Sequence, residues 1–261
     1  AREAGADGVT VSTLGIGLDF DEAYMAAVAQ NGHGNFAFVE DARALARFLE
    51  RELDETATTV VERAKMRIRL PAEMRLVRGV GADIEDRGGG EYDLRIGSLF
   101  SGDERRVVLE IEVDADAGDV MPIAADIKWR EIGGERAAVE LDELALVATD
   151  DIDAVRDAKN RRVFGSSVSA LASLRQLEAT EAYARGDLNG ANPLLMQNER
   201  ELADAADEAP EDVAEGLRRQ AKGYAATRDE INTAKPGSAA GRAAAKRVTA
   251  EEAANLARPA Y

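Results

Sequence analysis

The chain has 261 residues, of which 45% are hydrophobic, and its 50 acidic residues outnumber 33 basic ones to give a net charge of −17. This length and apolar content can bury a substantial core and predict one or two domains. The negative charge disfavours nucleic acid and anionic membranes as partners. Because the chain has no cysteine, disulfides and thiolate metal sites are excluded. We expect no membrane span and no signal peptide, and favour the cytoplasm as the compartment.

The stretch from Gly8 to Leu53 has the pattern of a strand, a helix, a second strand and a second helix. The first apolar run ends at Gly15 and Gly17, where the apolar spacing changes from that of a strand to that of a helix. This alternation is typical of a parallel sheet covered by helices. Either Asp19 or Asp21 is expected to cap the first helix. The residues expected on buried helix faces are Tyr24, Met25 and Val28 in the first helix, and Leu45, Phe48, Leu49, Leu53 and Val60 in the second.

These residues carry a resemblance to a known family. The order Val-Thr-Val-Ser-Thr-Leu-Gly-Ile-Gly over residues 9–17, the acidic helix start at Asp21-Glu22 and the run Gly-Asn-Phe-Ala-Phe-Val-Glu-Asp over residues 34–41 resemble the closing part of a bacterial von Willebrand factor type A (VWA) domain. The similarity is to the subgroup labelled calcium-activated chloride channel-like. Residues 66–71 and 98–113 are similar to the strand-rich segment that follows the domain there. The resemblance implies a Rossmann-like α/β layer and a binding or scaffold module.

The resemblance also implies where a metal ion would bind in the family. A divalent cation is held there by an Asp-x-Ser-x-Ser motif with a Thr and an Asp from later loops, all upstream of the part that residues 8–53 resemble. This chain begins at Ala1, without an initiating Met, so we expect the natural N-terminus further upstream and the metal ligands outside these residues. The nearest approach, Gly165-Ser166-Ser167-Val168-Ser169, has glycine where the first carboxylate is needed. We assign no metal-ligating residue and expect Mg²⁺ only in an intact VWA domain.

From Lys65 to about Val147 apolar and polar residues alternate, which predicts strands with one solvated face and therefore antiparallel pairing. Glycine-containing turns at residues 87–90, 101–103 and 133–134 separate the strands. The alternating apolar positions are Met66, Ile68 and Leu70; Tyr92, Leu94 and Ile96; Val107, Leu109, Ile111 and Val113; and Ile123, Ala125, Ile127 and Trp129. We therefore expect residues 1–64 to be the α/β part and residues 65–149 to form a β-sandwich.

Residues 150–261 are rich in Ala, Glu and Arg at helical spacing, and predict a helical tail or small bundle. One helix is expected from Ile152 to Tyr183, a second after the turn at 185–187, and a third from Glu211 to Thr233. The last segment, 242–256, has mostly Ala as its apolar content and is expected to fray, because it can bury little apolar surface. No second copy at a fixed period supports a repeat solenoid.

Gly15-x-Gly17 after a strand also suggests an alternative function, a Rossmann-type nucleotide-binding enzyme. The dinucleotide fingerprint needs a third glycine where Phe20 stands, and Asp19 and Asp21 would place negative charge where a pyrophosphate binds. The two glycines are explained more simply by a tight turn at the strand end. We expect no enzyme activity and keep nucleotide binding as the alternative.

Other polar residues have structural explanations. His33, the only histidine, is expected in a loop, since no orienting partner or nucleophile can be named for it. Asp114, Asp116 and Asp119 join two strands and lack the Glu of an EF-hand loop, so a solvated turn is expected rather than a calcium site.

Two further polar groups are expected at helix ends. Thr149, Asp150, Asp151 and Asp153 suit a helix N-terminus, where carboxylates meet the positive end of the dipole. In Arg185-Gly186-Asp187, which matches an integrin-binding tripeptide, the glycine suits a helix end and the aspartate the cap of the next helix.

The sequence thus predicts a non-catalytic protein interaction or scaffold module, with no catalytic, cofactor-binding or metal residue. A partner protein is expected, and a purely structural reading gives that interaction to residues 150–261. A parallel sheet with only two strands would expose an apolar edge, so self-association through the incomplete sheet, or poor order in residues 1–60, is a further expectation.

Overall fold

The computed structural model describes residues 1–258, with the backbone alone at Ala6 and Ala257. Contacts cluster into two compact units that interleave along the chain. Unit 1 comprises residues 1–11, 31–33 and 50–159, and unit 2 comprises residues 12–30, 34–49 and 160–261. The domain boundaries expected after residues 64 and 149 stay a prediction. No helix of the described residues is long and apolar enough to cross a membrane.

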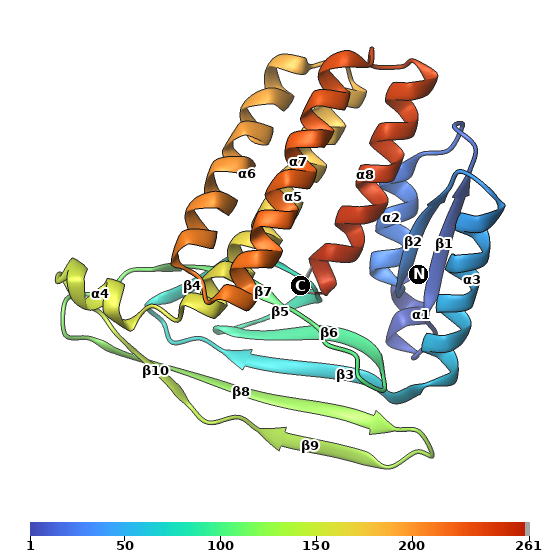
Figure 1. The fold of residues 1–261 in the computed structure, drawn as a ribbon. Helices are drawn as coiled ribbons and strands as arrows, with labels where there is room; N and C mark the ends of the chain where they lie inside the picture. Colours follow the sequence, from blue (N-terminus) through green and yellow to red (C-terminus); the bar gives the residue numbers. More distant parts are fainter. Residues whose placement is uncertain (259–261) are drawn as a thin grey trace. The chain divides into compact units, whose positions relative to one another are not determined.

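Unit 1 is built on a six-stranded antiparallel sheet with the order β10-β8-β3-β6-β5, in which β9 also pairs with β8 (Figure 1). A second, two-stranded sheet pairs β4 with β7. The strands are β3 (Thr59–Arg69), β4 (Met74–Val80), β5 (Asp83–Gly88), β6 (Glu91–Phe100), β7 (Val108–Val113), β8 (Val120–Glu131), β9 (Arg136–Glu140) and β10 (Leu144–Val147), and the unit also contains the short helices α1 (Arg2–Ala6) and α4 (Ile152–Ala158).

The alternation along β3 separates an apolar from a charged face of the large sheet. Ile68 of β3 and Leu94 of β6 pack with Met74 of β4, so the β4–β7 sheet contributes to the same core cluster. On the charged face, Asp93 is fully buried and receives the Arg67 guanidinium at 2.8 Å and the Lys65 ammonium at 2.6 Å. The hydrogen bond from Arg67 is the main cause that lowers the pKa of Asp93 to about 2. The strands of both sheets pair antiparallel, which confirms that prediction for residues 65–147.

The strand, helix, strand, helix order expected for residues 8–53 is also confirmed. β1 (Val11–Ile16) and β2 (His33–Val39) pair in a two-stranded sheet, with α2 (Glu22–Asn31) between them in the chain and α3 (Ala42–Ala57) after β2. Phe36 of β2, which is 5% exposed, belongs to the core.

The expected buried faces of these two helices are partly wrong. Tyr24 of α2 is 67% exposed and Leu53 of α3 is 71% exposed, while Leu49 is also exposed. Two strands offer too little surface to cover the whole apolar stripe of each helix. Val60 is not in α3, which ends at Ala57, but in β3.

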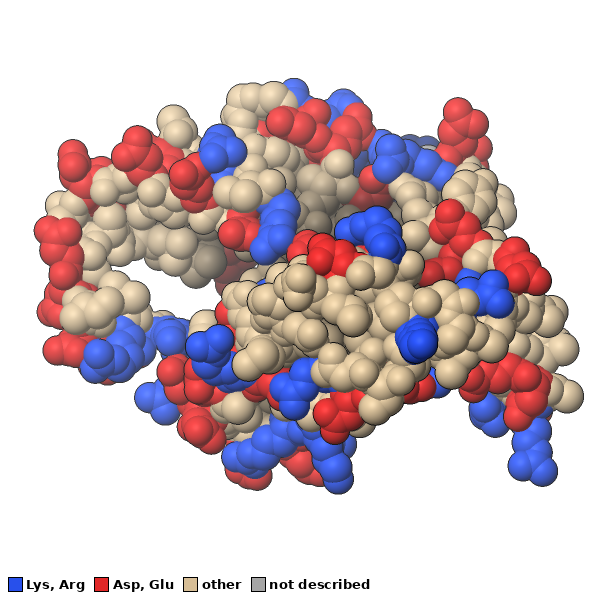
Figure 2. Space-filling model, turned by 90° about the horizontal axis from the view of Figure 1, so that it is seen from above, with Lys and Arg blue, Asp and Glu red and all other residues tan. Residues whose placement is uncertain are grey.

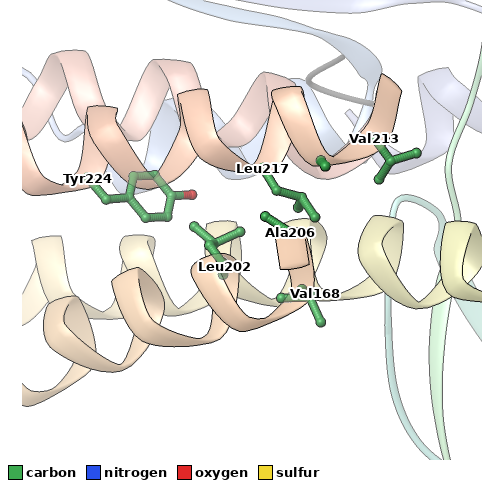
Figure 3. Packing of buried hydrophobic residues seen from close by; sticks show 9 residues of the cluster. Val168, Leu202, Ala206, Val213, Leu217 and Tyr224 are labelled. Atoms are coloured by element: carbon green, nitrogen blue, oxygen red, sulfur yellow. The ribbon is translucent and has the colours of Figure 1, made fainter. Parts of the chain in front are cut away.

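Four long helices complete unit 2: α5 (Arg161–Ala184), α6 (Leu188–Glu208), α7 (Glu211–Thr233) and α8 (Ala239–Ala257). Small residues let these helices approach closely. At Gly165 of α5 there is no room for a larger residue, since an added Cβ would lie 2.9 Å from Val213 Cγ1 of α7. Val168, Leu202, Leu217 and Tyr224 fill the core between α5, α6 and α7 (Figure 3).

Two expectations for the helices are wrong. The single helix expected from Ile152 to Tyr183 is broken at Lys159, where the backbone is extended, and Asn160 caps α5 through its side chain. α8 does not fray within the described residues, because its Ala244 and Val248 are buried and the helix packs against α5. Small side chains bury little apolar area, but they allow close helix packing. The prediction of fraying considered the buried area alone and left this packing out.

Candidate functional site

A cleft of about 810 Å³ lies within unit 2, between the residues that follow β1 and the helices α5 and α8. One wall is the loop from Leu18 to Asp21 with one face of α2 as far as Gln30, and the other includes Leu177 and Glu181 of α5 with Thr249 of α8. In open α/β sheets ligands commonly bind beyond the carboxyl ends of strands, and the loop starts at that end of β1. The cleft is therefore the candidate site.

A buried lysine on α8 fixes the loop wall of the cleft. Lys246 is 3% exposed, and its ammonium donates to the Phe20 carbonyl and to the Glu22 carboxylate, at 2.6 Å in each case. The same ammonium lies 4.0 Å from the centre of the Phe20 ring. A cation in this position stabilises the ring face, the carbonyl and the carboxylate together, so the loop is held in one place.

The N-terminus of α2 is capped on the same wall. Asp21, and not Asp19, provides the cap, because its carboxylate accepts the backbone N–H of Tyr24 at 2.9 Å. Asp19 is instead at the rim, where its carboxylate lies 3.3 Å from the guanidinium of Arg242 and is 93% exposed. An exposed pair of this kind contributes little to stability, so Asp19 is available to a ligand at small cost.

The lining of the cleft combines apolar side chains with several carboxylates. Thr180 and Thr249 donate their hydroxyls back to carbonyls of their own helices, so their methyl groups contribute to the apolar part. The charged lining residues are Asp19, Asp21, Glu22, Glu181 and Arg185. In the view of Figure 2, acidic and basic side chains are interspersed without an extended basic patch. Three of the four carboxylates are paired within the structure, Asp19 with Arg242, Glu22 with Lys246 and Glu181 with Arg185, so the excess is one negative charge. This small excess favours a cationic ligand group over an anionic one.

The geometry at Gly15 does not favour nucleotide binding. A Cβ on Gly15 would lie 2.1 Å from the Phe20 ring, so that ring occupies the space over the glycine where a pyrophosphate would have to approach. Gly17 has φ +77, and a Cβ added there would meet no atom within 4 Å, as expected for a turn residue. Gly15 thus serves the close packing of Phe20.

His33 is a packing residue in unit 1. It is the first residue of β2 rather than a loop residue, with φ 55. A Cβ on Gly5 or Gly97 would meet its side chain at 2.8 or 2.6 Å. Burial is the main cause that lowers its pKa. The two glycines therefore make room for the imidazole.

The aspartate groups form turns and caps. Asp119 accepts the N–H of Asp116 at 2.9 Å in the exposed turn between β7 and β8. Asp151 caps α4 through the N–H groups of Asp153 and Ala154. Asp187 caps α6 through the N–H of Gly190 at 2.8 Å. Within residues 1–258 no cluster of three or more His, Cys, Asp or Glu side chains is placed to hold a metal ion.

Comparison with known proteins gives matches among solved structures alone, since no family model and no curated protein matches the chain. A von Willebrand factor type A protein from Catenulispora acidiphila superposes with a TM-score of 0.60 at 19% identity, over 83% of this chain and 52% of that one. The fold of this chain is VWA-like. Human COPII-coat protein Sec24c matches with a TM-score of 0.50 at 15% identity, over 99% of this chain and 33% of that one. The ArnB paralog VWA2 from Sulfolobus acidocaldarius gives 0.46 at 13% identity, over 94% and 55%.

The comparisons confirm the VWA resemblance at the level of fold. The chain spans about half the length of the Catenulispora structure that it matches. The chloride channel-like subgroup, which the sequence pattern suggested, stays a prediction.

A buried polar network in the helices of the VWA-like chain was not expected from the sequence. Glu252 of α8 is 6% exposed and accepts the phenolic hydroxyl of Tyr224 of α7 at 2.7 Å. Ser173 of α5 lies 3.3 Å from the same hydroxyl and receives the Asn255 amide at 2.6 Å. Burial is the main cause that raises the pKa of Glu252 to about 7. The Ala-rich sequence around Glu252 does not indicate whether this glutamate is buried or exposed to solvent.

Proposed function

We propose that this VWA-like chain is a non-catalytic module that binds a partner protein, and that the partner docks in the cleft beside β1. The observation that carries the proposal is the cleft itself, at the carboxyl end of a strand, with one wall held by the buried Lys246. A wall that is fixed before binding reduces the entropy lost on association.

The lining suggests the chemistry of the partner. Leu18, Phe20 and Leu177 offer apolar contact, while Asp19 and Glu181 carry exposed carboxylates. A segment that places an Arg or Lys beside apolar side chains would satisfy both parts. Its cation would meet the carboxylates at the rim, and its apolar groups would be buried against the walls.

The wider proposal follows the resemblance. The chain belongs, on this view, to a bacterial VWA protein of the calcium-activated chloride channel-like subgroup, located in the cytoplasm. On this proposal the described residues act through protein contact.

The test compares two Ala→Trp variants. Ala26 of α2 lines the cleft, so Ala26→Trp fills it, whereas Ala46 is exposed on α3 away from the lining and Ala46→Trp is the matched control. A displayed random peptide library is selected against the wild-type chain, and enriched peptides are measured by fluorescence anisotropy. We expect enriched peptides to contain Arg or Lys next to apolar residues, and Ala26→Trp to weaken binding at least about tenfold.

Three results count against the proposal. They are an absence of enriched peptides, enrichment of acidic peptides, and equal binding by wild type and Ala26→Trp. A loss of binding in the Ala46→Trp control would show that the substitution acts through the fold rather than through the cleft, and would also contradict the assignment.

A further inference from the structure

The outer edge of the large sheet in unit 1 is formed by β9 and β10, which pair one after the other along β8 (Figure 1). Within the described residues no strand pairs with the outer side of either. Val139 is 44% exposed, Leu144 is 58% exposed and Val147 is 62% exposed. Edge strands are commonly protected from further pairing by Pro or by charged side chains, above all Lys. Residues 136–147 contain no Pro and no Lys, and their charges are Arg136, Glu140, Asp142 and Glu143. This edge is open to another strand.

Two backbone hydrogen bonds establish which groups of β9 face outward. The Leu141 N–H donates to β8, and the Glu135 carbonyl accepts from β8, at 2.9 Å in each case. Since alternate residues of an antiparallel strand bond to the same neighbour, the odd-numbered residues of β9 face β8. The N–H and carbonyl groups of Arg136, Ala138 and Glu140 therefore point to the open edge.

We propose that two copies of this chain associate through β9, with the two strands antiparallel and Ala138 on a two-fold axis. In that register Arg136 of each copy lies opposite Glu140 of the other, so both cross-strand pairs join opposite charges. The outward backbone groups of Arg136, Ala138 and Glu140 then bond to one another. The arrangement is isologous, as in most homodimers.

The charges within one copy support the same partner. In the pairing of β9 with β8, Arg136 lies opposite Arg130 and Glu140 lies opposite Asp126, so each β9 charge has a like charge beside it. Like charges directly opposite one another destabilise a sheet, and a second copy supplies the opposite charge on the outer side.

The other edge of the sheet is formed by β5, whose Asp83 and Glu85 are already paired with Arg95 of β6, and Glu85 also with Arg87. These carboxylates have opposite charges beside them within the chain, whereas Arg136 and Glu140 of β9 do not. The charge pattern therefore favours β9 as the edge that gains from a second copy. Because β9 has 5 residues, the contact is short, and we expect a weak dimer whose population rises with concentration.

The test reverses each of the two charges in a separate variant and then mixes the two variants. Arg136→Glu places glutamates at both positions, and Glu140→Arg places arginines at both, so each variant alone should dimerise at least about tenfold more weakly than wild type. In an equimolar mixture every cross-strand pair again joins opposite charges, so the mixed dimer should regain wild-type affinity. Sedimentation equilibrium over a concentration series up to the millimolar range measures all four samples.

The mixture controls for folding, since a variant that failed to fold could not be rescued by another variant. A wild-type chain that stays monomeric at millimolar concentration overturns the proposal. Single variants that dimerise as well as wild type overturn it too, as does a mixture that stays as weak as its components. Because β9 belongs to unit 1 and every residue of the cleft to unit 2, these results leave the proposed peptide-binding function untouched.

Discussion

The buried carboxyl of Glu252 predicts an unusual pH dependence of stability. It lies where α5, α7 and α8 meet, and its partners Tyr224, Ser173 and Asn255 are neutral. The charged neighbour Glu251 is acidic and raises the pKa of Glu252 further. The Glu252→Gln variant keeps the shape and an oxygen that can accept the Tyr224 hydroxyl, but it cannot ionise.

The magnitude follows from the pKa in the two states. The pKa of Glu252 rises from 4.5 to about 7 on folding. Since one pKa unit is worth roughly 1.4 kcal/mol, ionisation of this group costs the folded state about 3 kcal/mol. Because the folded pKa is the higher one, the full stability is present below about pH 4.5 and is lost as the pH rises through about 7.

The assay is urea denaturation followed by far-UV circular dichroism at several pH values between 4.5 and 8. The free energy of unfolding of Glu252→Gln should exceed that of wild type by an amount that grows with pH to about 3 kcal/mol. Glu178→Gln, at an exposed position of α5, makes the same change in net charge and should stay close to wild type at every pH. A difference between Glu252→Gln and wild type that does not change with pH would refute the reasoning.

Further predictions concern three other sites. Asp93→Asn should lower the free energy of unfolding by about 2 kcal/mol at neutral pH in urea titrations, because the lowered pKa of Asp93 contributes stability above pH 3.8 that is lost as pH falls toward about 2. Gly15→Ala must displace the Phe20 ring and should cost about 1–3 kcal/mol, whereas Gly223→Ala in an open part of α7 should gain about 0.5–1 kcal/mol; equal melting temperatures would contradict this. Lys246→Met should speed amide exchange in residues 18–21, and unchanged exchange would show that the ammonium does not hold the loop.

Features set by neighbouring residues could be predicted from the sequence. The caps at Asp151 and Asp187 depend on a side chain and the N–H groups two or three residues later, so the sequence contains all that is needed. The signal for the break at Lys159 was also present, because Asn160 is a good cap, but the Ala-rich helical pattern on both sides concealed it. Alternation likewise predicted β3, β6 and β8 of the large sheet and β7 of the small one.

Features that depend on distant residues could not be predicted. Alternation does not reveal that β9 and β10 share β8 as their neighbour, because strand order depends on the whole fold. The cleft requires residues near Phe20 to meet residues near Glu181, and neither segment indicates the other. The exposure of Tyr24 depends on how many strands lie beneath α2, which the helix pattern alone does not contain.

The two findings on α8 lead to a last prediction that joins stability to binding. Lys246 and Thr249 are three residues apart, as are Thr249 and Glu252, so the group that holds the cleft wall, a residue of the lining and the buried carboxyl follow one another along the helix. Ionisation of Glu252 weakens the packing of α8 and should therefore loosen the wall that Lys246 holds. A cleft-selected peptide should bind more weakly above pH 7 than at pH 6 in wild type, and this loss should be smaller in Glu252→Gln. Parallel pH profiles for the two proteins would show that peptide titration alone accounts for the change, and that α8 does not couple the two sites.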